Sequence, residues 1–448
     1  MVQAFQFLLS ISILVVLHEL GHFIPAKLFK TRVEKFYLFF DPWFSLFKIK
    51  KGETEYGIGW LPLGGYVKIA GMVDESLDTE QLKNPPQPWE FRAKPAWQRL
   101  IIMLGGVVVN FILGFLIYGL MLYYYGEEYI PADGLKYGIH ADSLAREIGL
   151  RDGDLIIGID GKPVENFQQI PIQILLNDPK YLDVVRNGET LKIDIKEDLV
   201  TKLIRKQGAF IEPAIVPIVD SVIPASPALN AGLQKGDRII AINDHRVYDF
   251  QDFAAFLKLY KNDEVVLSVI RSGDTIKLNP VTPDKNGKLG FFVQDITKQI
   301  DIKIEKYTLA EAIPQGVKKG TSTLVNYVKQ FKLVPKAPDS IGGFYTIAKQ
   351  FDETWNWRKF WAFTAMLSII LGIMNLLPIP ALDGGHVMFL IYEVITGINQ
   401  LSGFVIQSNM HNHQRHFCFF VSIVYRRQNI CLGNKQKIIC QVCFIQRV

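Results

Sequence analysis

The sequence predicts a membrane-embedded α-helical core with two small β-rich domains inserted between its second and third apolar segments. Three segments, residues 1–30, 97–125 and 359–397, contain apolar runs long enough to enter a bilayer. Between the second and third segments, a pattern of twenty residues occurs twice, 83 positions apart. Self-similarity at a fixed offset is typical of tandem structural units, so we expect two consecutive domains there.

The bulk composition of the 448 residues agrees with a mixed membrane and soluble chain, since 49% of them are hydrophobic. The net charge of +5 is spread along the chain without a dense basic stripe, so no nucleic-acid partner is predicted. All four cysteines lie in the last 31 residues. The body of the chain therefore has no disulfide framework.

The first segment, residues 1–30, contains two histidines and a carboxylate in an apolar run: His18, Glu19 and His22. Such groups at the depth of a bilayer cost several kcal/mol unless something binds them. Positions four apart share one face of a helix, so the two imidazoles point the same way. This H-E-x-x-H spacing is typical of a zinc site in which the glutamate acts on water.

Residues 31–96 form a connector that carries basic residues at both ends, which by the positive-inside rule makes it cytoplasmic and puts the N-terminus outside. Within it, the apolar stretch 56–70 predicts two short strands around residues 62–65. This hairpin is either a small packed element or one that dips against the membrane core.

The second segment, residues 97–125, ends in three tyrosines that suit a membrane interface. Its one central polar side chain is Asn110. A buried amide of this kind either joins helices by hydrogen bonding or orients a substrate and stabilises an oxyanion, and the residues alone do not choose.

The inserted region divides into domains at residues 126–212 and 213–300. The repeated pattern covers residues 148–167 and 231–250, with nine of twenty positions identical, including a Gly-Leu-x-x-Gly-Asp core. A Lys-rich amphipathic linker, residues 301–358, follows. It predicts a helix that lies on the membrane surface or a soluble linker helix.

The third segment, residues 359–397, is interrupted by Pro378 and Pro380, so we expect a kinked or partly unwound element. Catalytic zinc usually has three protein ligands, and Asp383 is the best third candidate because an unpaired aspartate there would be costly. The other interpretation is an ordinary Asp-Gly turn. Further acidic candidates lie in the connector, namely Glu34, Glu53 and Glu55, and His386 lies close enough to Asp383 in sequence to compete with it as a ligand. The family pattern described next gives that role to Asp383 and leaves His386 structural or supporting the ligands.

Taken together, these pieces resemble the site-2 protease family of intramembrane zinc metalloproteases, in particular its branch of regulators of sigma-E protease. The resemblance spans about residues 1–397. It rests on the order and spacing of HELGH at 18–22, WLPLGGYVKIAG at 60–71, GGVVVN at 105–110, two repeats resembling PDZ domains, and NLLPIPALDGGH at 375–386.

The resemblance implies that Zn²⁺ is bound by His18, His22 and Asp383, and that Glu19 is the general base and then the general acid. It also implies that several residues position the unwound substrate strand: Asn110, Asn375, Gly64, Gly65 and Tyr66. The expected partners are the lipid bilayer and single-pass transmembrane substrates, such as an anti-sigma factor already trimmed by another protease. The PDZ-like pair would act as a size filter that contacts peptides or substrate domains. The implied location is the bacterial inner membrane, with the N-terminus and PDZ-like domains on the periplasmic side.

The tail, residues 398–448, departs from the family pattern, because it contains no apolar run long enough for the expected fourth membrane helix. Its cysteines and histidines suggest either a metal-binding knuckle or a frameshifted C-terminus, and the abrupt change in composition favours the second. The alternative function is therefore a catalytically impaired membrane-bound PDZ adaptor.

Overall fold

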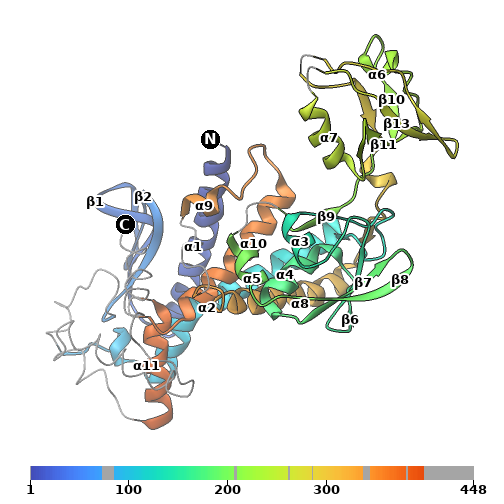
Figure 1. Cartoon of the computed structure of the whole chain (residues 1–448). Helices are drawn as coiled ribbons and strands as arrows, with labels where there is room; N and C mark the ends of the chain where they lie inside the picture. Colours follow the sequence, from blue (N-terminus) through green and yellow to red (C-terminus); the bar gives the residue numbers. More distant parts are fainter. Residues whose placement is uncertain are drawn as a thin grey trace. The chain divides into compact units, whose positions relative to one another are not determined.

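The structure, a computed structural model, describes residues 2–72, 85–205, 209–260, 263–284, 286–335, 344–379 and 382–397 (Figure 1). The chain divides into two compact units. The first contains Met1–Tyr124, Thr308–Tyr327 and Gly342–Val448, and the second contains Tyr125–Tyr307 and Val328–Ile341. The predictions made for the tail, residues 398–448, lie outside the described residues.

In the described part of the first unit, three helices are long and apolar enough to cross a membrane: α1 (Val2–Leu28), α2 (Ala96–Tyr125) and α10 (Trp357–Leu376). These helices confirm the three predicted membrane segments. Local sequence sets their ends. The side chain of Asn356 caps α10 by accepting a hydrogen bond from the Lys359 amide at 3.1 Å. Helix α2 stops before Gly126, whose φ of 74° favours glycine.

The third segment is broken as predicted. Helix α10 ends at Leu376, and a second helix, α11 (Asp383–Thr396), follows after an irregular stretch. Leu377 has a ψ of 140°, which is the extended conformation that a following proline imposes. A Cβ on Gly384 would lie 2.3 Å from the carbonyl oxygen of Leu377, so only glycine lets α11 start this close to the end of α10.

The connector folds into an antiparallel pair, β1 (Val33–Lys51) and β2 (Thr54–Ile69). Both strands bend, and residues 35–38 of β1 pair with residues 55–58 of β2 on one side and with 65–68 on the other. The two predicted strands around residues 62–65 therefore do not pair with each other, and the tight turn follows Lys51 instead. The prediction was wrong on this point because the true partner, β1, is distant from 62–65 in sequence.

Helix α8 (Leu309–Gln330) supplies the amphipathic helix expected in the linker. Its small residues pack on α2, since a Cβ on Gly316 would lie 2.4 Å from the Gly119 nitrogen. Apolar side chains such as Ile313 and Val317 remain exposed. A position on the membrane surface stays a prediction. The remaining short helices of the first unit are η2 (Phe91–Ala93) and α9 (Phe344–Ala348).

The second unit contains two four-stranded sheets with the same strand order. The first sheet runs β6 (Lys162–Pro163), β5 (Leu155–Ile159), β7 (Tyr181–Arg186), β8 (Glu189–Asp194). The second runs β12 (His245–Arg246), β11 (Arg238–Ile242), β13 (Leu267–Arg271), β14 (Asp274–Lys277). Each sheet has its own cluster of buried apolar side chains.

Shorter elements complete this unit. Three two-stranded pairs are present: β4 (Ile139–Ala141) with β9 (Ile211–Pro213), β10 (Val219–Val222) with β15 (Phe291–Val293), and β3 (Glu127–Tyr129) with β16 (Lys303–Glu305). The helices are α3 (Ser143–Glu147), α4 (Ile170–Asn177), α5 (Leu199–Arg205), α6 (Pro227–Asn230), α7 (Phe250–Leu259), η3 (Phe167–Gln169) and η4 (Ile296–Lys298).

The aspartate of each Gly-Asp pattern has a structural task. Asp154 and Asp237 are fully buried, and each accepts two hydrogen bonds of 2.7 Å from one arginine, Arg186 or Arg271. Each also accepts a backbone N–H from the loop just before it. In each copy the buried carboxylate holds the preceding loop by these hydrogen bonds, which explains why the two sequences share the Gly-Asp pair.

Candidate metal centre

Helix α1 places His18 and His22 on one buried face, with 7% and 5% of each residue exposed. Helix α2 crosses them closely. A Cβ on Gly106 would lie 2.4 Å from Nε2 of His22 and 2.6 Å from Cε1 of His18. A Cβ on Gly21 would lie 2.5 Å from the carbonyl oxygen of Gly105. The crossing therefore depends on glycines that sequence reasoning did not connect with the histidines.

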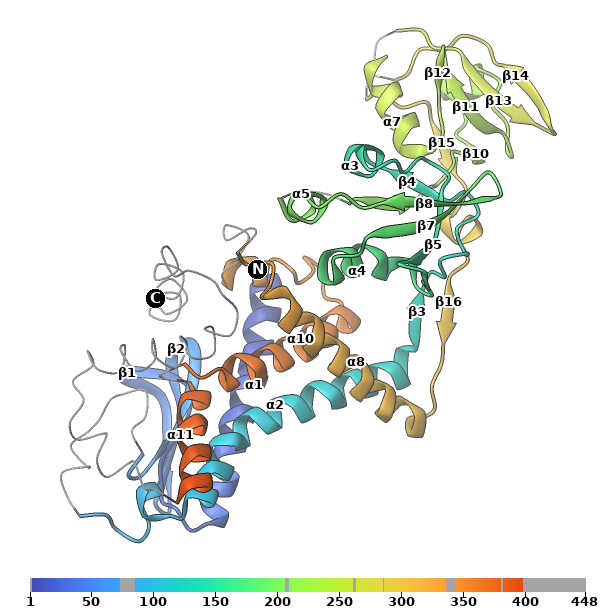
Figure 2. The ribbon, with the colours of Figure 1, turned by 60° about the horizontal axis from the view of Figure 1, so that its bottom comes forward.

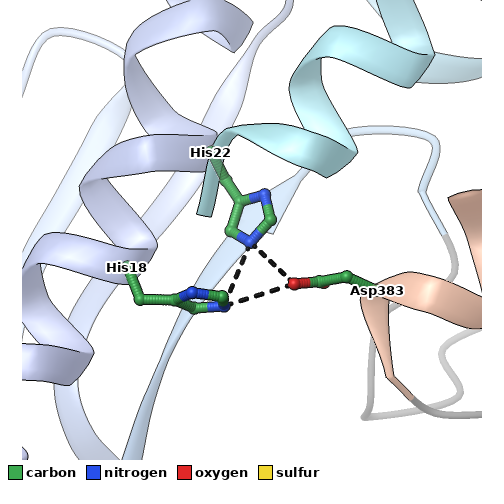
Figure 3. Close-up of side chains that lie close together, drawn as sticks. All are labelled: His18, His22 and Asp383. Carbon is green, nitrogen blue, oxygen red and sulfur yellow. Dashed lines mark hydrogen bonds and ion pairs between the residues drawn. The ribbon is translucent and has the colours of Figure 1, made fainter. Parts of the chain in front are cut away.

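Asp383, the first residue of α11, completes a triangle of donor atoms (Figure 3). Its Oδ2 lies 3.3 Å from Nε2 of His18 and 3.3 Å from Nε2 of His22. The two Nε2 atoms are also 3.3 Å apart. The structure thus brings together three predicted ligands from two helices that are more than 350 positions apart in sequence.

This triangle fits a tetrahedral zinc ion. Zinc bonds to nitrogen and oxygen of about 2.0–2.1 Å require ligand atoms about 3.3–3.4 Å apart, which matches all three sides. Among the described residues, Oδ2 of Asp383 is a buried carboxylate oxygen without a hydrogen-bond partner. A cation in the triangle would satisfy it.

Helix α2 also orients the imidazoles. Nδ1 of His22 lies 2.8 Å from the carbonyl oxygen of Ile102, which can only accept, so Nδ1 carries the proton and Nε2 presents a lone pair. The Asn110 side-chain amide lies 3.0 Å from Nδ1 of His18, and its Oδ1 is buried without a partner among the described residues. Turned over, the amide would accept the Nδ1 proton of His18 in the same way. Asn375 places its amide nitrogen 3.1 Å from Nε2 of His18.

The other acidic candidates lie apart from this triangle. Glu34 pairs with Lys68 at 3.8 Å, Glu55 accepts from the Tyr37 hydroxyl at 2.7 Å, and Glu53 is exposed in the hairpin. Among the described residues, the metal-ligating group around the histidines contains Asp383 and neither these glutamates nor His386.

The remaining predicted site residues lie in α1 and the hairpin. Glu19 is half-buried on α1. The hairpin reaches α1 one turn before His18, where a Cβ on Gly65 would lie 2.7 Å from Val15. Gly64 has a φ of 157°, and Tyr66 donates to Asp41 at 2.7 Å. The catalytic and substrate-binding roles of these residues stay predictions.

Sequence reasoning missed a second group of ligating side chains, in the second unit, formed by His140, Asp249 and Asp252. Nδ1 of His140 lies 2.5 Å from Oδ2 of Asp249, and this pairing raises the pKa of His140. The other oxygen of Asp249 caps α7 by accepting from the amides of Gln251 and Asp252. We interpret the group as an ion pair that joins β4 to the start of α7. No local sequence signal could have found it.

Comparison with known proteins gives consistent matches over most of the chain. The family model described as "Peptidase family M50" matches residues 6–410. The regulator of sigma-E protease RseP of Escherichia coli K12 is 30% identical over 421 residues, covering 88% of this chain and 90% of the relative. A Rickettsia conorii protein named "Putative zinc metalloprotease" is 29% identical over 399 residues, covering 89% of this chain and 90% of the relative.

Proposed function

The chain belongs to peptidase family M50, and we propose that it is an intramembrane zinc endopeptidase that cleaves single-pass membrane proteins. The triangle of His18, His22 and Asp383 is the observation that carries this proposal, because its 3.3 Å sides suit zinc. The zinc assignment is also supported by the names of the relatives. A trimmed anti-sigma factor is the proposed substrate class, and the similarity to a protein named regulator of sigma-E protease supports it.

Each residue has a defined task in this proposal. Zinc, when bound, supplies Lewis-acid polarisation of the scissile carbonyl and makes water acidic enough to lose a proton near neutral pH. Glu19 takes that proton from the attacking water and later gives it to the leaving amine. His22 is held by its hydrogen bond to the Ile102 carbonyl, which keeps Nε2 directed at the triangle.

The substrate must unwind to reach this site, because the carbonyls of an intact membrane helix are hydrogen-bonded within the helix. Asn375 lies next to His18, and the hairpin residues Gly64, Gly65 and Tyr66 belong to a strand that approaches α1. We assign these residues, together with Asn110, to positioning the unwound strand. Helix-destabilising residues in the substrate should therefore speed cleavage.

The proposed orientation puts the connector of residues 31–96 in the cytoplasm of a bacterium, with the chain in the inner membrane. It is supported by the basic residues at both ends of the connector. The two sheets of the second unit then lie on the periplasmic side, where PDZ-like domains would limit the size of substrates that reach the membrane.

The decisive experiment compares the detergent-purified full chain with its Glu19→Gln variant on a membrane-helix substrate. General acid and base catalysis contributes about 10²–10⁴-fold, so we expect at least about a 100-fold loss of kcat with zinc content unchanged. Glu53→Gln, at an exposed acid of the hairpin, is the control and should cleave like the unaltered chain.

Equal cleavage by the unaltered chain and Glu19→Gln would refute the assignment of Glu19. A chain that binds zinc and cleaves no membrane-helix substrate would support the alternative, a membrane-bound PDZ adaptor. Zinc content of Asp383→Ala, expected to fall relative to the unaltered chain, tests the third ligand separately.

A further inference from the structure

A buried ion pair joins α2 to α11 at a distance from the triangle of His18, His22 and Asp383, hereafter the metal triangle. Nη2 of Arg99, near the start of α2, lies 2.5 Å from Oε1 of Glu393, near the end of α11. Only 2% and 9% of the two side chains are exposed. Nε of Arg99 also donates to the carbonyl oxygen of Lys94 at 2.9 Å. Because desolvating two charges is costly, a buried pair is weak evidence for stability by itself, and its position needs another explanation.

The pair lies on the face of α2 that serves the metal triangle. Residues of an α-helix turn by about 100° each, so Arg99, Gly106 and Asn110 fall within about 20° of one line along α2. Gly106 lets the two imidazoles approach, and Asn110 contacts His18. One stripe of α2 therefore touches the histidines at one end and Glu393 at the other.

The distance along α11 between its two contact residues is close to the corresponding distance along α2. Glu393 follows Asp383 by ten residues, or about 15 Å of helix, while Asn110 follows Arg99 by eleven residues, or about 16–17 Å. The two helices run in opposite directions, and α11 lies beside the first part of α2 (Figure 2). Helix α11 thus meets its neighbours at two levels, α1 at the metal triangle and α2 at the ion pair.

The contacts between these levels are apolar. Val387 and Leu390 of α11 are buried in a cluster with Ile102 and Met103 of α2. Apolar burial is non-directional, so by itself it specifies the rotation of α11 less sharply than a hydrogen bond does. The N-cap residue of α11, Leu382, makes no side-chain capping bond. A functional group must be held within about 0.5 Å and about 10–20° of its working geometry, which a directional charged hydrogen bond can provide.

We propose that Arg99 and Glu393 are positioning residues that fix the rotation and height of α11, so that Asp383 meets the two histidines at the metal. This inference rests on the proposed function, because it assigns the pair to the zinc site. Neither side chain touches the triangle, and both act through α11.

The test measures zinc affinity of the detergent-purified full chain by competition with a chromophoric chelator. Changing residues that orient metal ligands typically weakens affinity about 10–100-fold, and we expect a loss in that range for Glu393→Gln. The matched control is Glu90→Gln. Glu90 is also buried and lies 2.5 Å from an arginine, Arg92, but outside α11, so its substitution should leave the affinity unchanged.

Two further readouts separate positioning from general stability. The visible absorption of bound Co²⁺ should change in Glu393→Gln. Because removing one partner of a buried ion pair lowers stability, both readouts are taken at a temperature at which thermal unfolding shows the metal-free variant to be folded. Thiolate charge-transfer bands would report metal on the tail, since all cysteines lie there. The charge-exchanged double variant Arg99→Glu with Glu393→Arg keeps a pair and should recover most of the affinity.

The possible results distinguish a failure of the positioning role from a failure of the proposed function. Unchanged zinc affinity in Glu393→Gln, with zinc bound by the unaltered chain, overturns the positioning role and leaves the proposed function intact. A loss of affinity that only follows unfolding of the metal-free chain, without recovery in the double variant, also overturns it. Absence of zinc from the unaltered chain overturns the proposed function itself.

Discussion

Asn110 shows how one side chain supports the metal triangle from a neighbouring helix. It is fully buried, its amide lies 3.0 Å from Nδ1 of His18, and the hydroxyl of Ser368 donates to its backbone carbonyl at 2.7 Å. The sequence left two roles open for this residue, a link between helices or a contact to the substrate. Its contact with the His18 ring adds a further possible task, orienting a proposed metal ligand, and its proposed contact with the substrate stays a prediction.

At this scale we predict that Asn110→Leu, which keeps the size and removes the hydrogen bond, weakens zinc binding by about 10-fold, the lower end of the range for residues that orient metal ligands. Chelator competition on the purified chain measures the change. Asn375→Leu serves as the comparison, because Asn375 approaches the other nitrogen of the same ring. Full zinc affinity combined with lost cleavage in Asn110→Leu would assign the residue to substrate positioning instead.

At the scale of elements, some short segments make contacts that the sequence of neither segment predicts. The carboxylate of Asp249 both caps α7 and pairs with His140 on β4. Burial would raise the pKa of Asp249, but its partners outweigh burial and the pKa is lowered. The groups that face His140 are Asp249, Asp252 and Asp152, whose Oδ1 lies 3.7 Å from Nδ1 of His140. Arg146 neutralises part of this charge by pairing with Asp152 at 2.8 Å.

These shifts predict how the contact between β4 and α7 responds to pH. The pKa of His140 is raised above its ordinary 6.5, so the stabilisation is complete below pH 6.5 and is lost as the pH rises through the raised pKa. The pKa of Asp249 is lowered below its ordinary 3.8, so the stabilisation is complete above pH 3.8 and is lost as the pH falls through the lowered pKa. The contact should therefore be most stable between pH 3.8 and pH 6.5.

Hydrogen exchange of the amides of Gln251 and Asp252, corrected for intrinsic exchange rates, measures this dependence. Protection should fall on going from pH 6 to pH 9 in the unaltered chain. The His140→Gln variant should show a flat profile over the same range. A flat profile in the unaltered chain would mean that the pair does not stabilise this contact.

At the scale of the whole molecule, the membrane topology determines on which side of the bilayer each part of the chain lies. We predict that a membrane-impermeant maleimide added to spheroplasts labels Glu189→Cys on the first sheet and spares Ala93→Cys in the connector until the cells are lysed. Both positions are exposed, and substituting the four tail cysteines by serine gives a background without thiols. Labelling of Ala93→Cys in intact spheroplasts would invert the proposed orientation.

The sequence by itself determined the features that depend on local pattern. Apolar length indicated the three membrane helices, and helical spacing put His18 and His22 on one face. Pro378 indicated the break before α11, because the residue before a proline is driven to extended backbone. Asp383 was found from the cost of leaving a charge unpaired in an apolar segment.

Only the tertiary structure decided the pairings between distant segments. The partner of Arg99 is 294 positions away, and residues 35–38 pair with two separate parts of β2. His140 and Asp249 likewise meet only when β4 approaches α7. These contacts depend on which helix and strand faces are buried together, which local periodicity does not specify. The three proposed zinc ligands were therefore predictable from the sequence, whereas the residues proposed to position them became visible only in the packed chain.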